Sequence, residues 1–222
     1  MMNLFESFDP TTSLNFSLNW FSLTLMFLII PLNFWVIPTR FEMFFMHISK
    51  IIFYEFKSLT KKKFKINILI FFSLMIFIAF SNFMGLFPYI FTNTSHFLFN
   101  LIIALSLWMS FFCYGWFNKP FNMLVHLVPL NTPNELMNFM VIIELISNII
   151  RPFTLAIRLT ANMIAGHLLL TLLGTFISKF LIIIPFMILI QNMLLVLEIA
   201  VSFIQAYVFS ILSLLYFLES KI

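Results

Sequence analysis

Long apolar stretches separated by short polar segments run along the whole chain. The first stretch, residues 18–37, has about 20 residues, enough at about 1.5 Å per helical residue to cross a hydrocarbon core of about 30 Å. Two further stretches, 66–91 and 97–117, flank a polar turn at 92–96 and predict a helical hairpin. All three are far longer than the roughly 9–11 residues of a membrane-barrel strand, so the pattern predicts an all-α integral membrane protein.

The carboxyl-terminal part, residues 132–218, predicts a hairpin of two longer helices. Its start is marked by Thr132-Pro133-Asn134-Glu135, a capping box with proline at the first helical position. The first helix continues to Phe176 with Pro152 as an internal kink, and the second run, 180–218, has 39 residues. Such a helix is about 58 Å long, roughly twice the hydrocarbon thickness. Because no turn signal interrupts the second half of this run, one steeply tilted helix is favoured over two short spans.

The segment 41–65 between the first stretch and the helical hairpin mixes aromatic and charged residues. Basic side chains that share one third of a helical wheel are Arg40, His47, Lys50 and Lys57. Glu42 and Glu55 lie outside that arc. The pattern predicts an interfacial helix that leads into a basic loop, with a plain loop as the alternative.

Composition and charge exclude a soluble fold. Hydrophobic residues make up 62% and charged residues 9% of the chain, against about 25% charged residues in soluble domains. No Asp, Glu, Lys or Arg occurs between Lys65 and Lys119. Six of the twelve basic residues lie between Lys50 and Lys65, which is typical of an inner membrane-flanking loop and not of a nucleic-acid-binding surface. We therefore expect five crossings, with the amino terminus outside and the carboxyl terminus inside.

Cysteine usage and the amino-terminal sequence narrow the cellular setting. The one cysteine, Cys113, allows no intramolecular disulfide and no thiolate metal cluster, so no cofactor or metal is expected. The first ten residues contain Glu6 and Asp9 and no Lys or Arg, the reverse of a transit peptide. Together with 33 Phe and 14 Met, this composition indicates synthesis inside an organelle from an AT-rich genome.

The predicted carboxyl-terminal hairpin carries ionisable residues at membrane depth, where each costs at least about 2.5–3.5 kcal/mol. Glu144, Arg151 and Arg158 are spaced seven apart, which places them near one stripe of a helix. Asn148 and Asn162 follow Glu144 and Arg158 by four residues and extend this polar track. The alternative is a purely structural role, in which Glu144 and Arg151 form an ion pair and the amide side chains only hold neighbouring helices together.

A second polar face lies on the last helix, where Glu198, Ser202 and Gln205 are spaced i, i+4 and i+7. His167, nine residues after Arg158, is turned to the opposite side of its helix and should meet a different neighbour. Such chains of titratable groups are typical of proton relays.

The chemistry of these side chains divides their roles. Glu144, Glu198 and His167 exchange protons, whereas Arg158 keeps its proton and acts only as a fixed charge. A fixed cation in lipid needs a mobile anion, and no Asp or Glu of this chain can move past it. We therefore expect a partner subunit that supplies the anion.

Two runs of the carboxyl-terminal part carry a specific resemblance. Residues 158–167, RLTANMIAGH, and 198–209, EIAVSFIQAYVF, resemble subunit a (subunit 6) of the mitochondrial F-type ATP synthase, and the similarity covers 135–217 in order and spacing. It implies a proton-translocating stator of the Fo sector, not catalytic alone, whose last two helices lie tilted against a ring of c subunits. Two offset half-channels would carry protons to and from the ring carboxylates and couple proton flow to rotation and ATP synthesis.

The resemblance also implies roles for individual residues. The positions implied in proton translocation are Arg158, Glu144, His167, Glu198, Asn162, Gln205 and Glu219. Arg158 would face the ring carboxylates, with Asn162 and Gln205 around it. His167 and Glu198 would belong to the half-channel of the intermembrane space, and Glu144 and Glu219 to the matrix side. Arg151 receives no transferred role, and a structural ion pair is expected for it.

The implied partners are the c-subunit ring, the peripheral stalk and other Fo subunits, the F1 ATPase head and membrane lipid, with no nucleic acid. The implied location is the mitochondrial inner membrane, with the amino terminus in the intermembrane space, the carboxyl terminus in the matrix and a mitochondrial gene. One alternative is a proton-channel subunit of a respiratory complex, although no Lys lies deep in a predicted span. The other is a purely structural membrane scaffold.

Overall fold

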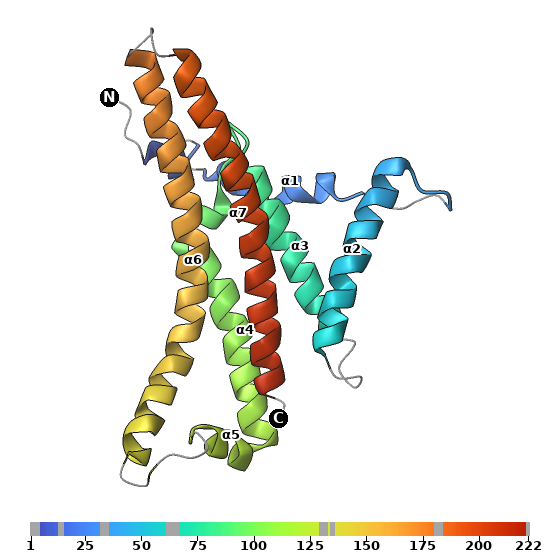
Figure 1. The fold of residues 1–222 in the computed structure, drawn as a ribbon, viewed down its shortest axis with the longest axis vertical. Helices are drawn as coiled ribbons and strands as arrows, with labels where there is room; N and C mark the ends of the chain where they lie inside the picture. Colours follow the sequence, from blue (N-terminus) through green and yellow to red (C-terminus); the bar gives the residue numbers. More distant parts are fainter. Residues whose placement is uncertain are drawn as a thin grey trace.

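Four long helices lie side by side along the longest axis of the molecule (Figure 1). They are α3 (Ile68–Gly85), α4 (Phe97–Asn118), α6 (Met137–Lys179) and α7 (Ile184–Glu219). The computed structural model describes residues 5–12, 16–31, 36–60, 67–128, 133, 136–179 and 184–220. Among the described residues, the four helices named above are long and apolar enough to cross a membrane, which confirms the predicted all-α membrane class.

The amino-terminal segment corrects the predicted first span over 18–37. Its helix comprises η2 (Leu18–Phe21) and α1 (Ser22–Ile29), which together reach only about 18 Å. Ile30 is extended, with φ −68° and ψ 116°, because Pro31 disfavours the helical conformation in the residue before it. Figure 1 shows α1 lying across the long helices, so the first of the five expected crossings becomes a shorter apolar helix.

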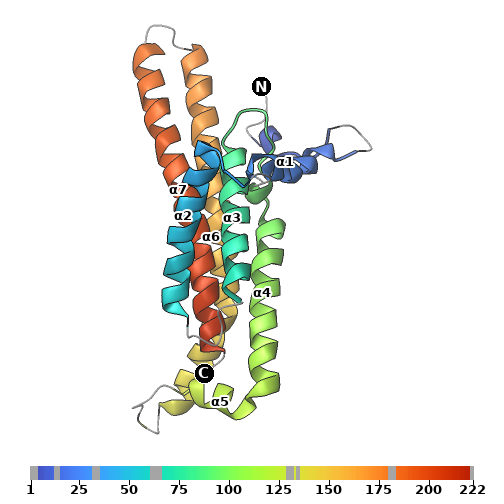
Figure 2. The ribbon, with the colours of Figure 1, turned by 90° about the vertical axis from the view of Figure 1, so that its right-hand side faces the viewer.

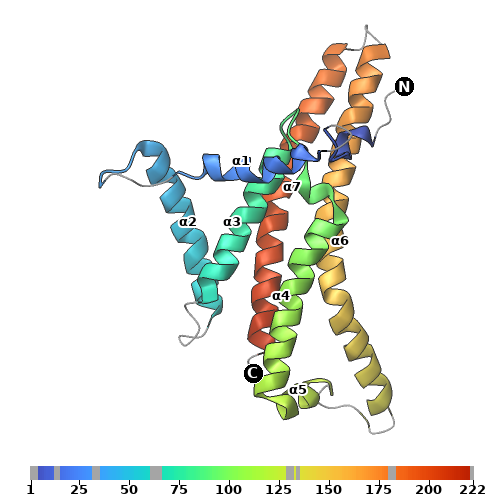
Figure 3. The ribbon, with the colours of Figure 1, turned by 180° about the vertical axis from the view of Figure 1, so that it is seen from behind.

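Helix α2 (Arg40–Leu59) occupies the segment for which the sequence left a choice between a helix and a loop. Its first turn is fixed by a capping box, in which the Thr39 amide donates to Glu42 at 2.6 Å and the Glu42 amide donates to the Thr39 hydroxyl. The helix approaches α3 most closely at its lower end (Figure 3). It buries Phe56, and the ring of Phe53 makes an edge contact with that of Phe72 on α3. The basic positions 61–65 lie outside the described residues.

Helices α3 and α4 form the predicted hairpin around residues 92–96, which contain the short helix η4 (Asn93–Ser95). This polar turn is buried, and it packs against α6. After α4 the chain forms the short helix α5 (Pro120–His126), and Pro120 starts it in the favoured first helical position. The capping box expected at 132–135 lies outside the described residues, apart from Pro133.

Helices α6 and α7 are the predicted long hairpin, with 43 and 36 residues and lengths of about 64 and 54 Å. Each is continuous, and Pro152 lies inside α6, whose lower part diverges from α7 (Figure 1). We call the end near Lys179 the upper end and the end near Glu219 the lower end. At the upper end α6 and α7 extend beyond α3 and α4 (Figure 2), so neither matches a single upright crossing.

Small residues allow the four long helices to pack closely. The central buried cluster is Ile78, Ala79, Ala104, Leu155, Ala156, Leu159, Ala206 and Phe209. Ala156 and Ala206 are 0% exposed. In lipid, where apolar side chains gain little by leaving the solvent, such close backbone approach is a main source of helix association.

We predict that Ala156→Leu lowers the stability of the bundle by about 1–3 kcal/mol, because three additional heavy atoms must enter a filled site. The measurement is thermal unfolding of the detergent-solubilised chain. Ala200→Leu, the same substitution at an exposed position of α7, is the matched control. Equal melting temperatures for both variants would contradict the packing described here.

Candidate functional site

The ionisable side chains of α6 and α7 gather around two separate cavities. The lower cavity, about 640 Å³, lies between α4, α5 and the lower ends of α6 and α7 and is lined by Glu144, Arg151 and Glu219. The upper cavity, about 190 Å³, lies between α3, α6 and α7 and is lined by His167 and Glu198. The predicted site residues thus divide into two groups at different depths.

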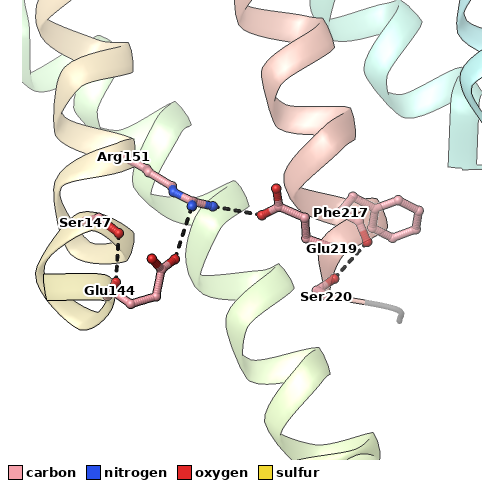
Figure 4. A network of polar contacts seen from close by, with 6 residues as sticks. All are labelled: Glu144, Ser147, Arg151, Phe217, Glu219 and Ser220. Carbon is pink, nitrogen blue, oxygen red and sulfur yellow. Dashed lines mark hydrogen bonds and ion pairs between the residues drawn. The ribbon is translucent and has the colours of Figure 1, made fainter. Parts of the chain in front are cut away.

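Arg151 joins both acidic residues of the lower cavity (Figure 4). Its Nη2 lies 3.5 Å from Oε1 of Glu144, and its Nη1 donates to Oε2 of Glu219 at 2.8 Å. The guanidinium also lies 5.2 Å from the ring centroid of Tyr216, a cation–π distance. The expected Glu144–Arg151 ion pair is confirmed, and Glu219 extends it from α6 to α7.

The lower group spans the gap that opens where α6 diverges from α7. Arg151 precedes Pro152, whose ring prevents a regular helical hydrogen bond at this turn. With both carboxylates ionised, the three side chains carry a net charge of −1, so the cavity combines one fixed cation with two groups that can exchange protons. The aromatic wall opposite them comes mainly from α4 and includes Trp108 and Phe112, which are stacked with ring centroids 5.0 Å apart.

Glu198 of the upper cavity rests directly on Gly166 of α6. A Cβ atom at position 166 would lie 2.5 Å from Oε1 of Glu198 and 2.9 Å from its Cδ, closer than real Cβ contacts allow. The absence of a side chain at Gly166 therefore makes the niche for the carboxylate. Oε2 of Glu198 is buried and has no hydrogen-bond partner among the described residues.

His167 meets neighbours outside the polar stripe of α6, as predicted. Its ring packs edge-on against that of Phe8, with the ring centroids 6.3 Å apart. Its Nε2 is buried without a partner in the described chain. Asn82 of α3 also lines the cavity, and its amide nitrogen lies 3.5 Å from the Ser202 carbonyl.

Arg158 lies on α6 between the two cavities and lines neither of them. Its side chain is exposed on the outer face of the bundle, and in the described part of the chain it makes no ion pair or hydrogen bond. Asn162 and Gln205, the polar positions expected around Arg158, line the upper cavity. The structure therefore brings together His167, Glu198, Asn162 and Gln205, and separately Glu144 and Glu219, while Arg158 stays apart.

Sequence reasoning missed Asn82, Gly166 and the contact between Arg151 and Glu219. Asn82 had a signal, because it is an amide in a stretch without charged residues. Gly166 shows its role only through the position of Glu198 on another helix. Arg151 and Glu219 are 68 residues apart, so spacing along one helix could not connect them.

A bundle of membrane-length helices with titratable groups in two cavities and an outward arginine between them is typical of a polytopic membrane protein with a functional polar site. The chain belongs to the family described as ATP synthase A chain, whose profile matches residues 16–218. It is thus a membrane subunit of the ATP synthase and is not catalytic by itself, as expected.

Relatives named ATP synthase subunit a are similar over nearly the full length. The protein of Apis mellifera ligustica is 56% identical over 221 residues, which cover 100% of this chain and 98% of the relative. That of Locusta migratoria is 56% identical over 219 residues, with 97% of each chain covered. That of Drosophila melanogaster is 54% identical over 218 residues, again with 97% of each covered. These comparisons favour the ATP synthase over a respiratory complex or a scaffold.

We predict that Gly166→Ala lowers ATP-driven proton pumping by about fivefold or more, because the methyl group displaces the Glu198 carboxylate. The measurement is acidification of membrane vesicles. Gly174→Ala, where nothing lies within 4 Å of the new Cβ, should pump normally. The double variant Gly166→Ala, Glu198→Asp has a shorter acidic side chain and should recover part of the lost proton pumping. Equal pumping by the two alanine variants would contradict the niche.

We predict a positive coupling between Arg151 and Glu219 in a double-mutant cycle with Arg151→Gln and Glu219→Gln. The coupling should be small, about 0.5–1 kcal/mol, because Glu219 is 59% exposed and solvent weakens the pair. The measurement is thermal unfolding of the purified complex. A control cycle of Arg151→Gln with Glu55→Gln, a carboxylate bonded to Tyr207 instead, should be additive; coupling of equal size in both cycles would contradict the pair.

Proposed function

We propose that the chain is the proton-translocating stator subunit of the Fo sector. The observation that supports this proposal is the outward position of Arg158 between two cavities that hold titratable groups at different depths. The upper cavity would be the half-channel through which protons reach the rotor, and the lower cavity the half-channel through which they leave.

The fixed charge of Arg158 separates the two half-channels. A guanidinium keeps its proton at physiological pH, so it blocks direct transfer along α6 from His167 to Glu144. An unpaired cation at membrane depth is costly, and the described residues offer it no carboxylate. A carboxylate on each passing c subunit would supply the missing anion, and the arginine would favour its ionised form.

The outer faces of α6 and α7 offer a surface for this rotor. Large apolar side chains are exposed on them, including Phe153, Ile157, Val196 and Ile204. By composition alone, such a surface could face either lipid or a hydrophobic partner. The charge of Arg158 favours a partner that carries an acidic side chain.

The proposed proton cycle has two steps, loading and release of a proton on a c-ring carboxylate. A proton reaches a c-ring carboxylate through the His167 and Glu198 side and neutralises it, so that this carboxylate can turn through lipid. On returning to Arg158 from the other side the carboxylate releases its proton, which leaves past Glu144 and Glu219. Asn162 and Gln205 would hold water and polar contacts around the arginine.

Location and assembly complete the proposal. Lys57 in the last turn of α2 and Lys119 after α4 lie at the lower ends of their helices, and in the sequence the basic run 61–65 directly follows α2. By the positive-inside rule the lower end would therefore face the matrix. The amino terminus would lie in the intermembrane space and the chain in the mitochondrial inner membrane, encoded in the organelle. The peripheral stalk, other Fo subunits and the F1 head would be its further partners.

We predict that Arg158→Ala abolishes ATP-driven acidification and that Arg158→Lys does not restore it, because a compact, strongly hydrated ammonium differs from the guanidinium in geometry and hydration. The measurement uses membranes in which native electrophoresis shows an intact complex of normal amount. Arg40→Ala, at an exposed arginine of α2, is the control and should pump normally. Normal acidification by either Arg158 variant would contradict the role of Arg158 as the fixed charge that separates the two half-channels.

A further inference from the structure

Buried polar atoms without a protein partner are confined to the upper and middle parts of the described structure. They are Asn82 Oδ1, Asn93 Oδ1, Thr94 Oγ1, His96 Nε2, His167 Nε2 and Glu198 Oε2. Each such atom costs about 1–3 kcal/mol unless something satisfies it, and in native proteins that role falls to internal water. Three of the atoms surround the upper cavity, and the other three belong to the turn 92–96.

Hydrogen bonds from Asn93 and Asn100 hold the turn in place. Ser22 donates its hydroxyl to the Phe91 carbonyl at 3.1 Å, so the contact of 2.7 Å between Asn93 and Ser22 must be a bond from the Asn93 amide. Asn100 likewise donates to the Thr94 carbonyl at 2.7 Å. These bonds fix the orientation of the Asn93 side chain and leave its Oδ1 as a free acceptor, in the same way as Asn82 Oδ1 at the cavity.

The turn and the upper cavity share one wall. A Cβ at Gly85 would lie 3.1 Å from Cγ2 of Thr92 and 3.3 Å from Cε of Met163, so both side chains press on the bare glycine. Met163 lines the cavity, so a residue of the turn and a residue of the cavity wall meet at Gly85.

His96 marks the outer side of the turn. Its ring is partly exposed and lies between Trp20 and Phe91, with both centroid distances 5.2 Å. The turn thus holds a partly exposed titratable ring, a buried hydroxyl and a buried amide oxygen, and its Thr92 side chain reaches Gly85. Hydrogen-bond acceptors that face inward favour water that donates to them and favour hydronium over anions.

We propose that the turn 92–96 is the outer section of the proton uptake path, in which water held by His96, Asn93 and Thr94 leads protons past Gly85 to His167 and Glu198. This inference rests on the proposed function and adds a segment that the resemblance did not assign. It makes the buried polarity of the turn functional, because an apolar turn of the same shape would pack without unsatisfied atoms.

The sharpest test is Thr94→Val, which removes the orphaned hydroxyl and keeps the shape of the side chain. The bond from Asn100 is retained, because it ends on the backbone carbonyl of residue 94. If the turn were only structural, the loss of an unsatisfied hydroxyl would leave conduction unchanged. The proposed path predicts instead that passive proton conductance of reconstituted, F1-stripped Fo falls about fivefold, the equivalent of about 1 kcal/mol.

Two further variants control this measurement. Thr175→Val removes an exposed hydroxyl of α6 that donates to the Leu172 carbonyl at 2.8 Å, and it should conduct as the wild type does. Thr94→Ser keeps a hydroxyl in place and should restore most of the conductance. Thr94 is 1% exposed, so Thr94→Cys in a Cys113→Ser background should react with a small water-soluble methanethiosulfonate only where water reaches it.

The outcomes separate this inference from the proposed function. Reduced conductance in Thr94→Val, with rescue by serine and a reactive cysteine, supports the uptake path. Wild-type conductance in Thr94→Val together with an unreactive cysteine overturns it and leaves the proposed function intact, provided that the wild type conducts and Arg158→Ala does not drive pumping. Conductance of the wild-type complex that does not depend on this chain would overturn the proposed function itself.

Discussion

Placing a charged side chain at membrane depth costs at least about 2.5–3.5 kcal/mol, and the arrangement of α6 and α7 follows from how each charge is accommodated. Arg151 has two carboxylates and an aromatic ring around its guanidinium. Glu198 fits into a niche that exists only because Gly166 has no side chain. Arg158 alone among these residues receives nothing from the described chain. A fixed cation that the described chain leaves unpaired at membrane depth indicates a partner at its position.

The packing of the bundle serves the same constraint. Close contact between α3, α4, α6 and α7 depends on small buried residues such as Ala156 and Ala206. Because these contacts hold the middle of the bundle together, α6 can diverge from α7 below Pro152 and leave room for the lower cavity. The central buried cluster thus lies between the two polar regions and keeps them apart.

The long helices and their class were predictable because apolar runs of membrane length have few other solutions in lipid. The end of the first helix was harder to place: Pro31 was visible, but its effect on Ile30 competed with an apolar run that continued to Ile37. The polar turn 92–96 was expected in the connection, yet its burial depends on Ser22 and Asn100, which lie elsewhere in the chain. The link from Arg151 to Glu219 likewise arises only when α7 returns beside α6.

The distances along α6 explain why a rotor follows from the proposed function. From Arg151 to His167 the helix rises by sixteen residues, about 24 Å, which is most of a hydrocarbon core of about 30 Å. Neither cavity covers this distance, and Arg158 lies inside the interval with a proton that it does not exchange. A continuous channel would let protons cross without doing work. Under the proposed function, a proton would complete the crossing only on a carboxylate that moves, and the side of Arg158 on which that carboxylate is loaded would set the direction of its movement.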